Sequence, residues 1–150
     1  MSAATVDGIY VARAAGEPVQ PLLRAELAAG AGVKGDRYAA RQGYWSDPRW
    51  PDQELTLVEA ELEEAMGVAP GGLRRNIVTR GIDLRTLTGR RFAIGTALLE
   101  GVRPCDPCMH LEELTRPGLF QELAGRGGLR ARIVRGGEVA VGDAIRLSGE

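Results

Sequence analysis

The chain has 150 residues, of which 44% are hydrophobic and 26% charged, a composition that fits one globular domain with its own core. The formal net charge of −1 gives no electrostatic support for general nucleic-acid binding, and no apolar run approaches the length that crosses a bilayer. The first residues lack the basic and apolar regions of a signal peptide, so we expect one cytoplasmic domain over residues 1–150.

The first third of the chain predicts two strands joined by a turn and followed by an irregular loop. Residues 5–13 are rich in β-forming side chains and predict an opening strand. Residues 16–21 predict a turn, and residues 22–28 predict a second strand. Residues 30–52 contain four glycines and two prolines, which predicts a loop without a long regular element.

A strand and a short helix are predicted next. Residues 55–58 predict the strand, and residues 59–66 predict an acidic helix. The helix should end at Gly67, because glycine is common just beyond the last helical turn. We expect its acidic side to face solvent, with Leu62 and Ala65 turned toward the core.

The following segments are short strands and short helices. Residues 74–80 predict a strand, and residues 91–100 predict two strands around Gly95. Short helices are predicted for residues 111–114 and for residues 119–124, the second beginning after a proline.

The end of the chain is expected to form a β-hairpin. Residues 129–135 and 138–147 flank Gly136 and Gly137, which suit a tight turn between two strands. Short strands predominate along the chain. We therefore predict a mainly β fold, barrel-like, with a few short peripheral helices.

Every cysteine and histidine of the chain falls within six consecutive positions. Cys105 and Cys108 are the only cysteines, His110 is the only histidine, and Arg103 precedes them. A cation beside a thiol favours the thiolate, which is the form that attacks sulfur or binds metal. The sequence thus places its candidate chemistry in residues 103–110.

An ordered set of motifs runs through the chain: Gly35-Asp36-Arg37, Leu55-Thr56-Leu57-Val58-Glu59, Arg74-Arg75-Asn76-Ile77-Val78, Gly81-Ile82-Asp83-Leu84, Gly95, Pro107-Cys108, Gly125-Arg126-Gly127-Gly128 and Gly142-Asp143. Together they resemble a MOSC domain, named from the C-terminal domain of molybdenum-cofactor sulfurase, over about residues 5–147. The resemblance implies a β-rich, barrel-like fold and a role in sulfur or molybdenum-cofactor chemistry. It also selects Cys108, which follows a proline, as the residue that carries a persulfide or ligates molybdenum held by a pterin.

Cys108 has several readings. As a sulfur carrier it needs a thiolate, which Arg103 can stabilise, while His110 can exchange a proton near neutral pH. Cys105 can then resolve a persulfide or a sulfenic acid on Cys108. Alternatively Cys108 is a small buried hydrophobe, or zinc binds Cys105, Cys108 and His110 with a fourth ligand from a carboxylate or a subunit contact.

Two further groups of residues are candidates for binding an anionic cofactor. Arg75 and Asn76 suit a phosphate, because an arginine fork pairs with phosphate through two hydrogen bonds. Arg74 is ranked behind them, since neighbours in a strand face opposite ways. Lys34 and Arg37 lie in a glycine-rich loop that can cradle an anion.

Other residues of that loop have a structural interpretation. Asp36 is expected to hold the loop through bonds from its side chain to the backbone. Tyr44, Trp45 and Trp50 either stack on a flat heterocycle or close one end of the barrel.

The sequence favours a sulfur-transfer protein that uses Cys108 and a basic pocket. Its sulfur donor would be a cysteine desulfurase or a small persulfide, and no nucleic acid or membrane is expected as a partner. One alternative is a component of a molybdenum–pterin reductase with a redox partner, in which Cys108 ligates the metal. Another is a non-catalytic module that binds a cofactor or is stabilised by zinc. Molybdopterin is the expected cofactor, zinc is a weaker candidate, and no pyridoxal phosphate is expected within this chain.

Overall fold

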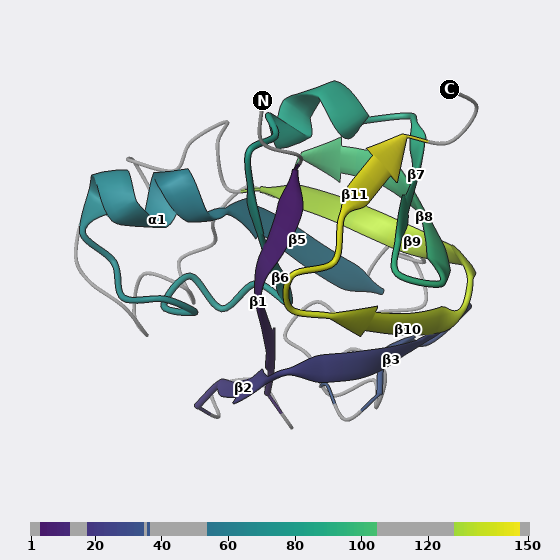
Figure 1. Cartoon of the computed structure of the whole chain (residues 1–150), viewed down its shortest axis with the longest axis horizontal. Coiled ribbons are helices and arrows are strands. Elements are labelled where there is room, and N and C mark those ends of the chain that lie inside the picture. Colours follow the sequence, from purple (N-terminus) through teal and green to yellow (C-terminus); the bar gives the residue numbers. More distant parts are fainter. Residues whose placement is uncertain (1–3, 13–17, 35, 37–53, 105–127, 148–150) are drawn as a thin grey trace.

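The structure is a computed structural model that describes residues 4–12, 18–34, 36, 54–104 and 128–147 (Figure 1). Over these residues the chain is mainly β, with one α-helix and one short 3-10 helix. Its elements are β1 (Thr5–Val11), β2 (Gln20–Leu22), β3 (Arg24–Ala28), β4 (Gly32–Val33), β5 (Leu55–Glu59), α1 (Ala60–Met66), β6 (Ile77–Arg80), η1 (Leu84–Leu87), β7 (Arg91–Ile94), β8 (Ala97–Pro104), β9 (Leu129–Arg135), β10 (Gly137–Ala140) and β11 (Ile145–Leu147). The mainly β prediction is confirmed. The helices predicted for residues 111–114 and 119–124 lie outside the described residues.

The larger sheet curves into a barrel-like shape without closing as a continuous ladder. Its described strands follow the order β11-β7-β8-β9-β5-β6-β1-β2, and the β5–β6 pair is parallel. The start of β1 returns to the opposite edge through an isolated bridge between Thr5 and Ala144. Two backbone hydrogen bonds flank this bridge, from Val6 N to Asp143 O at 2.9 Å and from Ile145 N to Ala4 O at 2.9 Å. The two edges of the sheet therefore meet over a few residues.

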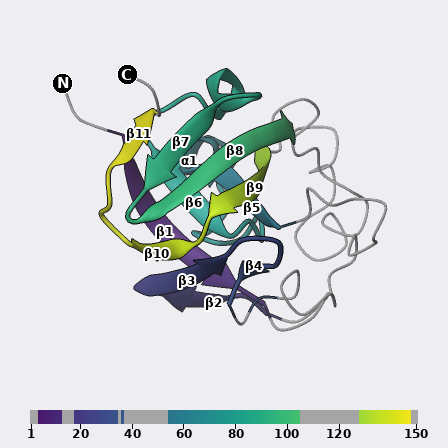
Figure 2. The same cartoon turned by 90° about the vertical axis from the view of Figure 1, so that its right-hand side faces the viewer.

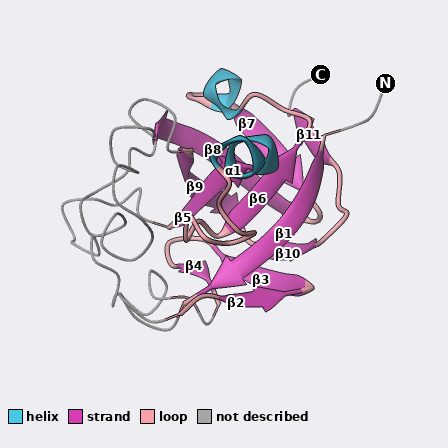
Figure 3. Ribbon diagram, turned by 90° about the vertical axis from the view of Figure 1, so that its left-hand side faces the viewer, coloured by secondary structure: helices cyan, strands magenta, loops and turns pink. Residues whose placement is uncertain are grey.

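A second sheet, in the order β10-β3-β4, lies beside the first (Figure 2). The main core is enclosed by strands of both sheets and includes Leu55, Leu57 and Phe92, each with no exposed surface, and Val139 of β10. Because successive side chains of a strand point to opposite faces, Val58 of β5 faces away from this core. Val58 joins a smaller apolar cluster under α1, which lies in front of β5 and β6 in Figure 3.

The acidic helix forms where the sequence predicts it. It ends at Gly67, which has a left-handed backbone with φ of 68° and donates its N–H to Glu64 O. Leu62 is buried as expected, but Ala65 is exposed and Glu63 is buried with only 4% of its surface exposed. The prediction for Ala65 was wrong because the segment after the helix folds back over the side of α1 that carries Glu63.

Three predicted features of the strands were also wrong in detail. The strand predicted for residues 22–28 is divided at Leu23, and Gln20 and Pro21 belong to β2 rather than to a turn. Proline is tolerated there because β2 is the edge of its sheet. The strand predicted for residues 74–80 begins only at Ile77, and Arg74 has a left-handed backbone with φ of 61°. Arg74 and Arg75 are not in a strand, so the alternation of side chains in a strand does not apply to them.

The terminal hairpin is not formed either. β9 pairs with β8 and β5, whereas β10 pairs with β3 in the other sheet. Gly136 alone separates β9 from β10, and a Cβ at this position would meet Leu27 O at 2.7 Å. The glycine lets the chain pass closely from one sheet to the other. The turn at Gly142-Asp143 is present, with the Ala140 N–H donated to Asp143 Oδ2 at 2.8 Å.

Candidate functional site

The cysteine segment itself lies outside the described residues, as do Arg37, Tyr44, Trp45 and Trp50. The roles predicted for Cys105, Cys108 and His110 therefore stay predictions. We call residues 105–127 the cysteine segment. The described residues on either side of it show which strands it connects. β8 ends at Pro104, directly before Cys105, and Pro104 is paired with Leu129 of β9. Both ends of the segment are thus attached to neighbouring strands.

Gly128 fixes the returning end against β5. Its φ is 114°, and a Cβ placed on it would collide with the carbonyl oxygen of Leu57. Only glycine allows the backbone to come so close in this conformation. This contact explains the last glycine of the Gly125–Gly128 motif.

A row of polar side chains crosses the sheet beside these ends. Arg103 of β8 is paired with Arg130 of β9, and Arg130 is paired with Thr56 of β5. Residues directly opposite one another in neighbouring strands present their side chains on the same face. Arg103, Arg130 and Thr56 therefore share the face of the sheet that is opposite to the main core.

Asn76 continues the row toward β6. It is fully buried, and its Oδ1 accepts hydrogen bonds from Thr56 N at 3.0 Å and from Thr56 Oγ1 at 3.4 Å. Its Nδ2 donates to Tyr10 O at 3.2 Å, and its own N–H is donated to Thr56 Oγ1 at 3.2 Å. The Asn76 side chain thus joins β5 and β1 at the start of β6, a structural function that the sequence did not reveal.

Arg75 immediately precedes Asn76 and is buried, with 8% of its surface exposed; Arg130 is 7% exposed. Arg103 is half-buried. We call Arg75, Asn76, Thr56, Arg130 and Arg103 the basic row. The structure brings Arg103 and Asn76, predicted separately from the sequence, into one row across the sheet, and Arg75 directly precedes Asn76 in the chain.

Arg130 was missed by sequence reasoning. It lies between Leu129 and Ala131, which are buried in the main core, and alternation alone places Arg130 on the opposite face. That signal was present in the sequence. The pairing of Arg130 with Arg103 and Thr56 was not, because it depends on the register of three strands that are distant in the chain.

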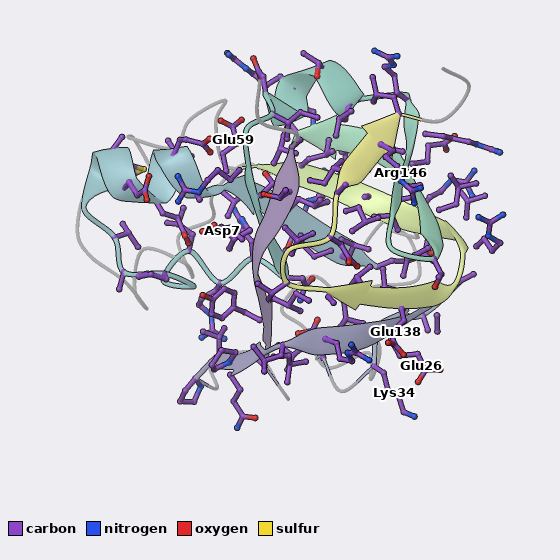
Figure 4. The ribbon with its side chains drawn as sticks, viewed as in Figure 1. Asp7, Glu26, Lys34, Glu59, Glu138 and Arg146 are labelled. Carbon is purple, nitrogen blue, oxygen red and sulfur yellow. The ribbon has the colours of Figure 1, made fainter. Side chains whose placement is uncertain are left out.

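Lys34 lies away from the basic row, after β4 of the smaller sheet. Its Nζ is 3.4 Å from Glu26 Oε2, and both side chains are largely exposed (Figure 4). Its predicted role in binding a cofactor stays a prediction. The structural role predicted for Asp36 is confirmed, because the buried Asp36 Oδ1 accepts the N–H of Ala12 at 3.0 Å and ties this loop to β1.

The described ranges were compared with the requirements of a metal site and of a membrane-spanning helix, and they meet neither. Within them no group of three or more Cys, His, Asp or Glu side chains is arranged to hold a metal ion. In this same part of the chain, no helix has the length and apolar character needed to span a membrane.

Comparisons with known proteins agree with the observed fold. The YuaD protein of Bacillus subtilis is 23% identical, with a TM-score of 0.77 over 97% of this chain and 96% of that one. YiiM of Escherichia coli is 20% identical, with a TM-score of 0.72 over 100% of this chain and 71% of that one. YiiM of Geobacillus stearothermophilus is 18% identical, with a TM-score of 0.70 over 96% of this chain and 74% of that one.

These structural likenesses concern the fold alone, and a search among curated proteins by sequence found no match. The family follows from a different comparison, which matches the sequence to a family model. The family model described as the MOSC domain matches residues 50–146, which include all five residues of the basic row and the whole cysteine segment. The chain therefore belongs to the MOSC domain family, which is associated with the chemistry of molybdenum-cofactor sulfurase.

Proposed function

We propose that this protein is a sulfur carrier in which Cys108 accepts sulfane sulfur beside the basic row. The observation that carries the proposal is the position of that row. Arg103 is two residues before Cys105 and is paired with the buried Arg130, next to the points where the cysteine segment joins the sheet. Cations at these points favour the thiolate form of a nearby cysteine and attract an anionic substrate.

The proposed transfer is a simple displacement at sulfur. The thiolate of Cys108 attacks the outer sulfur of a donor persulfide, forming one S–S bond while the S–S bond of the donor breaks. The donor leaves as a thiolate, and the outer sulfur keeps its proton, so no external oxidant or reductant is consumed. His110 is assigned the exchange of that proton near neutral pH. Cys105 is assigned the later attack on the inner sulfur of the persulfide, which forms a Cys105–Cys108 disulfide and releases hydrosulfide.

The basic row also fits the anionic part of a pterin cofactor. Arginine binds phosphate through paired, charge-assisted hydrogen bonds, and three arginines of the row are buried or half-buried rather than fully solvated. Arg75, Arg103 and Arg130 would hold the phosphate of molybdopterin, whose molybdenum would supply the acceptor for the transferred sulfur. A donor such as a cysteine desulfurase is proposed as the partner.

The direct test uses thiosulfate, a dianion that carries one sulfane sulfur. The reduced protein is incubated with thiosulfate, and peptide masses are read before and after treatment with a thiol reductant. We expect Cys108 to gain the mass of one sulfur atom, with sulfite as the leaving group, and to lose it on reduction. The matched variants are Cys108→Ser, which should take up no sulfur, and Cys105→Ser, which should keep the persulfide longer.

A different pattern would overturn the proposal. Uptake that is equal in the wild-type and Cys108→Ser proteins would exclude Cys108 as the carrier. No uptake from thiosulfate or from a small persulfide, together with a molybdenum–pterin group in the purified protein, would favour the reductase component. Stoichiometric zinc whose removal unfolds the protein would favour the zinc-stabilised module.

A further inference from the structure

A pocket beside α1 contains a buried carboxyl group. The pocket has an empty volume of about 320 Å³ and lies between α1, β1, β6 and the residues that follow α1. Glu63 projects into it from α1, together with Tyr10 and Asp7 of β1, Glu64 of α1 and Arg80 of β6. None of these residues belongs to the basic row.

Glu63 holds the backbone that follows the helix. Its Oε2 accepts the N–H of Gly71 at 3.2 Å, and the N–H of Leu73 also hydrogen bonds to this carboxyl group. Gly71 has a left-handed backbone with φ of 80°, and Leu73 has no exposed surface. The carboxyl group therefore fixes the path of the chain just before Arg75 and Asn76.

Tyr10 connects this contact with Asn76. A Cβ on Gly71 would be only 2.7 Å from Tyr10 Cε1, so the tyrosine ring packs directly on the Gly71 backbone. The backbone of the same tyrosine is bonded to Asn76 twice, by its N–H donated to Asn76 O at 2.7 Å and by its carbonyl accepting from Asn76 Nδ2. A displacement of Gly71 thus reaches Asn76 through a single packed residue.

The charges around Glu63 leave its own carboxyl group as the one that responds near neutral pH. Arg80 binds Asp7 Oδ1 at 3.1 Å and Glu64 Oε2 at 2.8 Å, and its hydrogen bond lowers the pKa of Glu64. Burial raises the pKa of the Tyr10 hydroxyl, which stays protonated. Burial also raises the pKa of Glu63 to about 7, although the hydrogen bonds from Gly71 and Leu73 act in the opposite direction.

We propose that Glu63 is a positioning residue that holds the segment bearing Arg75 and Asn76, and that its ionisation loosens this segment and weakens anion binding at the basic row. The part that concerns anions rests on the proposed function. The contact of Glu63 with the backbone of Gly71 and Leu73 is independent of the proposed function.

The sign of the effect follows from linkage. When the segment opens locally, water reaches Glu63 and its pKa returns toward the ordinary value of 4.5. The closed segment therefore binds the proton more tightly than the open one, and its stability is greatest below pH 4.5. The equilibrium constant for opening rises as the pH increases to about 7, by a total factor on the order of 100. Above that pH it stays constant.

The first experiment measures amide hydrogen exchange at Gly71 and Leu73 between pH 5 and pH 8.5, corrected for intrinsic exchange. We expect protection in the wild-type protein to fall from pH 5 to about pH 7 by a factor on the order of 100, and to stay constant at higher pH. Glu63→Gln keeps a neutral acceptor for the amides and should retain high protection at every pH. Glu61→Gln makes the same change on the exposed side of α1, where Glu61 accepts the N–H of Gly81, and should behave as the wild type.

The second experiment measures the affinity for thiosulfate, which stays a dianion over this pH range, by calorimetry with the same proteins carrying Cys108→Ser, so that no sulfur is transferred. We expect the loss of affinity from pH 6 to pH 8 to be roughly threefold greater with Glu63 present than in Glu63→Gln, since an added negative charge and a looser segment both disfavour the anion. Binding whose pH dependence is the same in the wild type and in Glu63→Gln would overturn the inference. The same holds for unchanged protection of Gly71. Absence of thiosulfate binding at every pH would instead sink the proposed anion site, which keeps the two failures distinct.

Discussion

The polar side chains of the basic row and those of the smaller sheet differ in how far they are exposed to water. In the basic row, Asn76 has no exposed surface and its side chain makes three hydrogen bonds to Thr56 and Tyr10. In the smaller sheet, Arg24 and Glu138 form an ion pair at 3.2 Å with side chains that are 71% and 58% exposed. The first arrangement is costly to disturb because water cannot replace a lost partner, whereas in the second arrangement water is always at hand.

The buried polar side chains have a fixed geometry, and they lie near the cysteine segment. Thr56 and Arg130 lie on β5 and β9 beside the described ends of the cysteine segment at Pro104 and Gly128, on the face away from the main core, and Asn76 is hydrogen-bonded to Thr56. The hydrogen bonds that Asn76 makes with Thr56 and Tyr10 fix one geometry there, which a site for a charged ligand requires. The exposed pairs of β3 and β10 impose no such geometry. Substitutions in the two regions should therefore differ greatly in effect.

Substitution of Asn76 should have the largest effect. Asn76→Ala removes the acceptor for Thr56 N and the donor to Tyr10 O in a site without solvent, so we expect a loss of about 3 kcal/mol in the free energy of unfolding. Urea denaturation of both proteins measures this loss. Asn76→Asp keeps the acceptor for Thr56 N but sets a carboxylate oxygen opposite Tyr10 O, so it should lose stability as well. A loss below about 1 kcal/mol in Asn76→Ala would mean that the network contributes little.

The next prediction compares the buried Arg130 with the half-buried Arg132 on the same strand. Arg130→Gln should weaken thiosulfate binding roughly tenfold, which corresponds to one charge-assisted contact with the anion. Arg132→Gln is the matched control, because Arg132 lies two residues further along β9, on the same face, with its Nε 2.7 Å from Glu100 Oε1. We expect less than a twofold change for this variant.

Calorimetry of the two variants in a Cys108→Ser background, at constant ionic strength, gives the comparison without sulfur transfer. Equal losses in Arg130→Gln and Arg132→Gln would show that the anion responds to the net charge of the sheet rather than to the basic row. The variants differ from the wild type by the same charge, so a difference between them isolates position.

Local patterns in the sequence predict much of this fold. The β-forming residues of β1, the apolar run of β5 and the glycine that ends α1 each act within a few neighbours, and these elements appear close to where they are expected. The ordered motifs predicted the family as well. The terminal hairpin failed because a local turn signal at Gly136-Gly137 was outweighed by pairing of β10 with the distant β3.

The site was predictable only in part, for the same reason. Arg75, Asn76 and Arg103 could be named as polar residues with suitable chemistry, but their relation depends on strand register. Glu63 was assigned to the solvated side of α1, since a glutamate in a short acidic helix is usually exposed. Its burial results from the backbone at Gly71 and Leu73, which supplies two N–H donors that no helical pattern reveals.

The smallest expected effect tests the exposed side of the comparison. A double-mutant cycle of Arg24→Gln and Glu138→Gln should give a coupling energy of about 0.3 kcal/mol, because two mobile side chains lose entropy when they pair and water screens their attraction. Salt should reduce even this value, which urea denaturation at low and high ionic strength can measure. A coupling above about 1 kcal/mol that persists in salt would show that the smaller sheet relies on its charges as strongly as the basic row relies on its buried hydrogen bonds, and the contrast between the two regions would not hold.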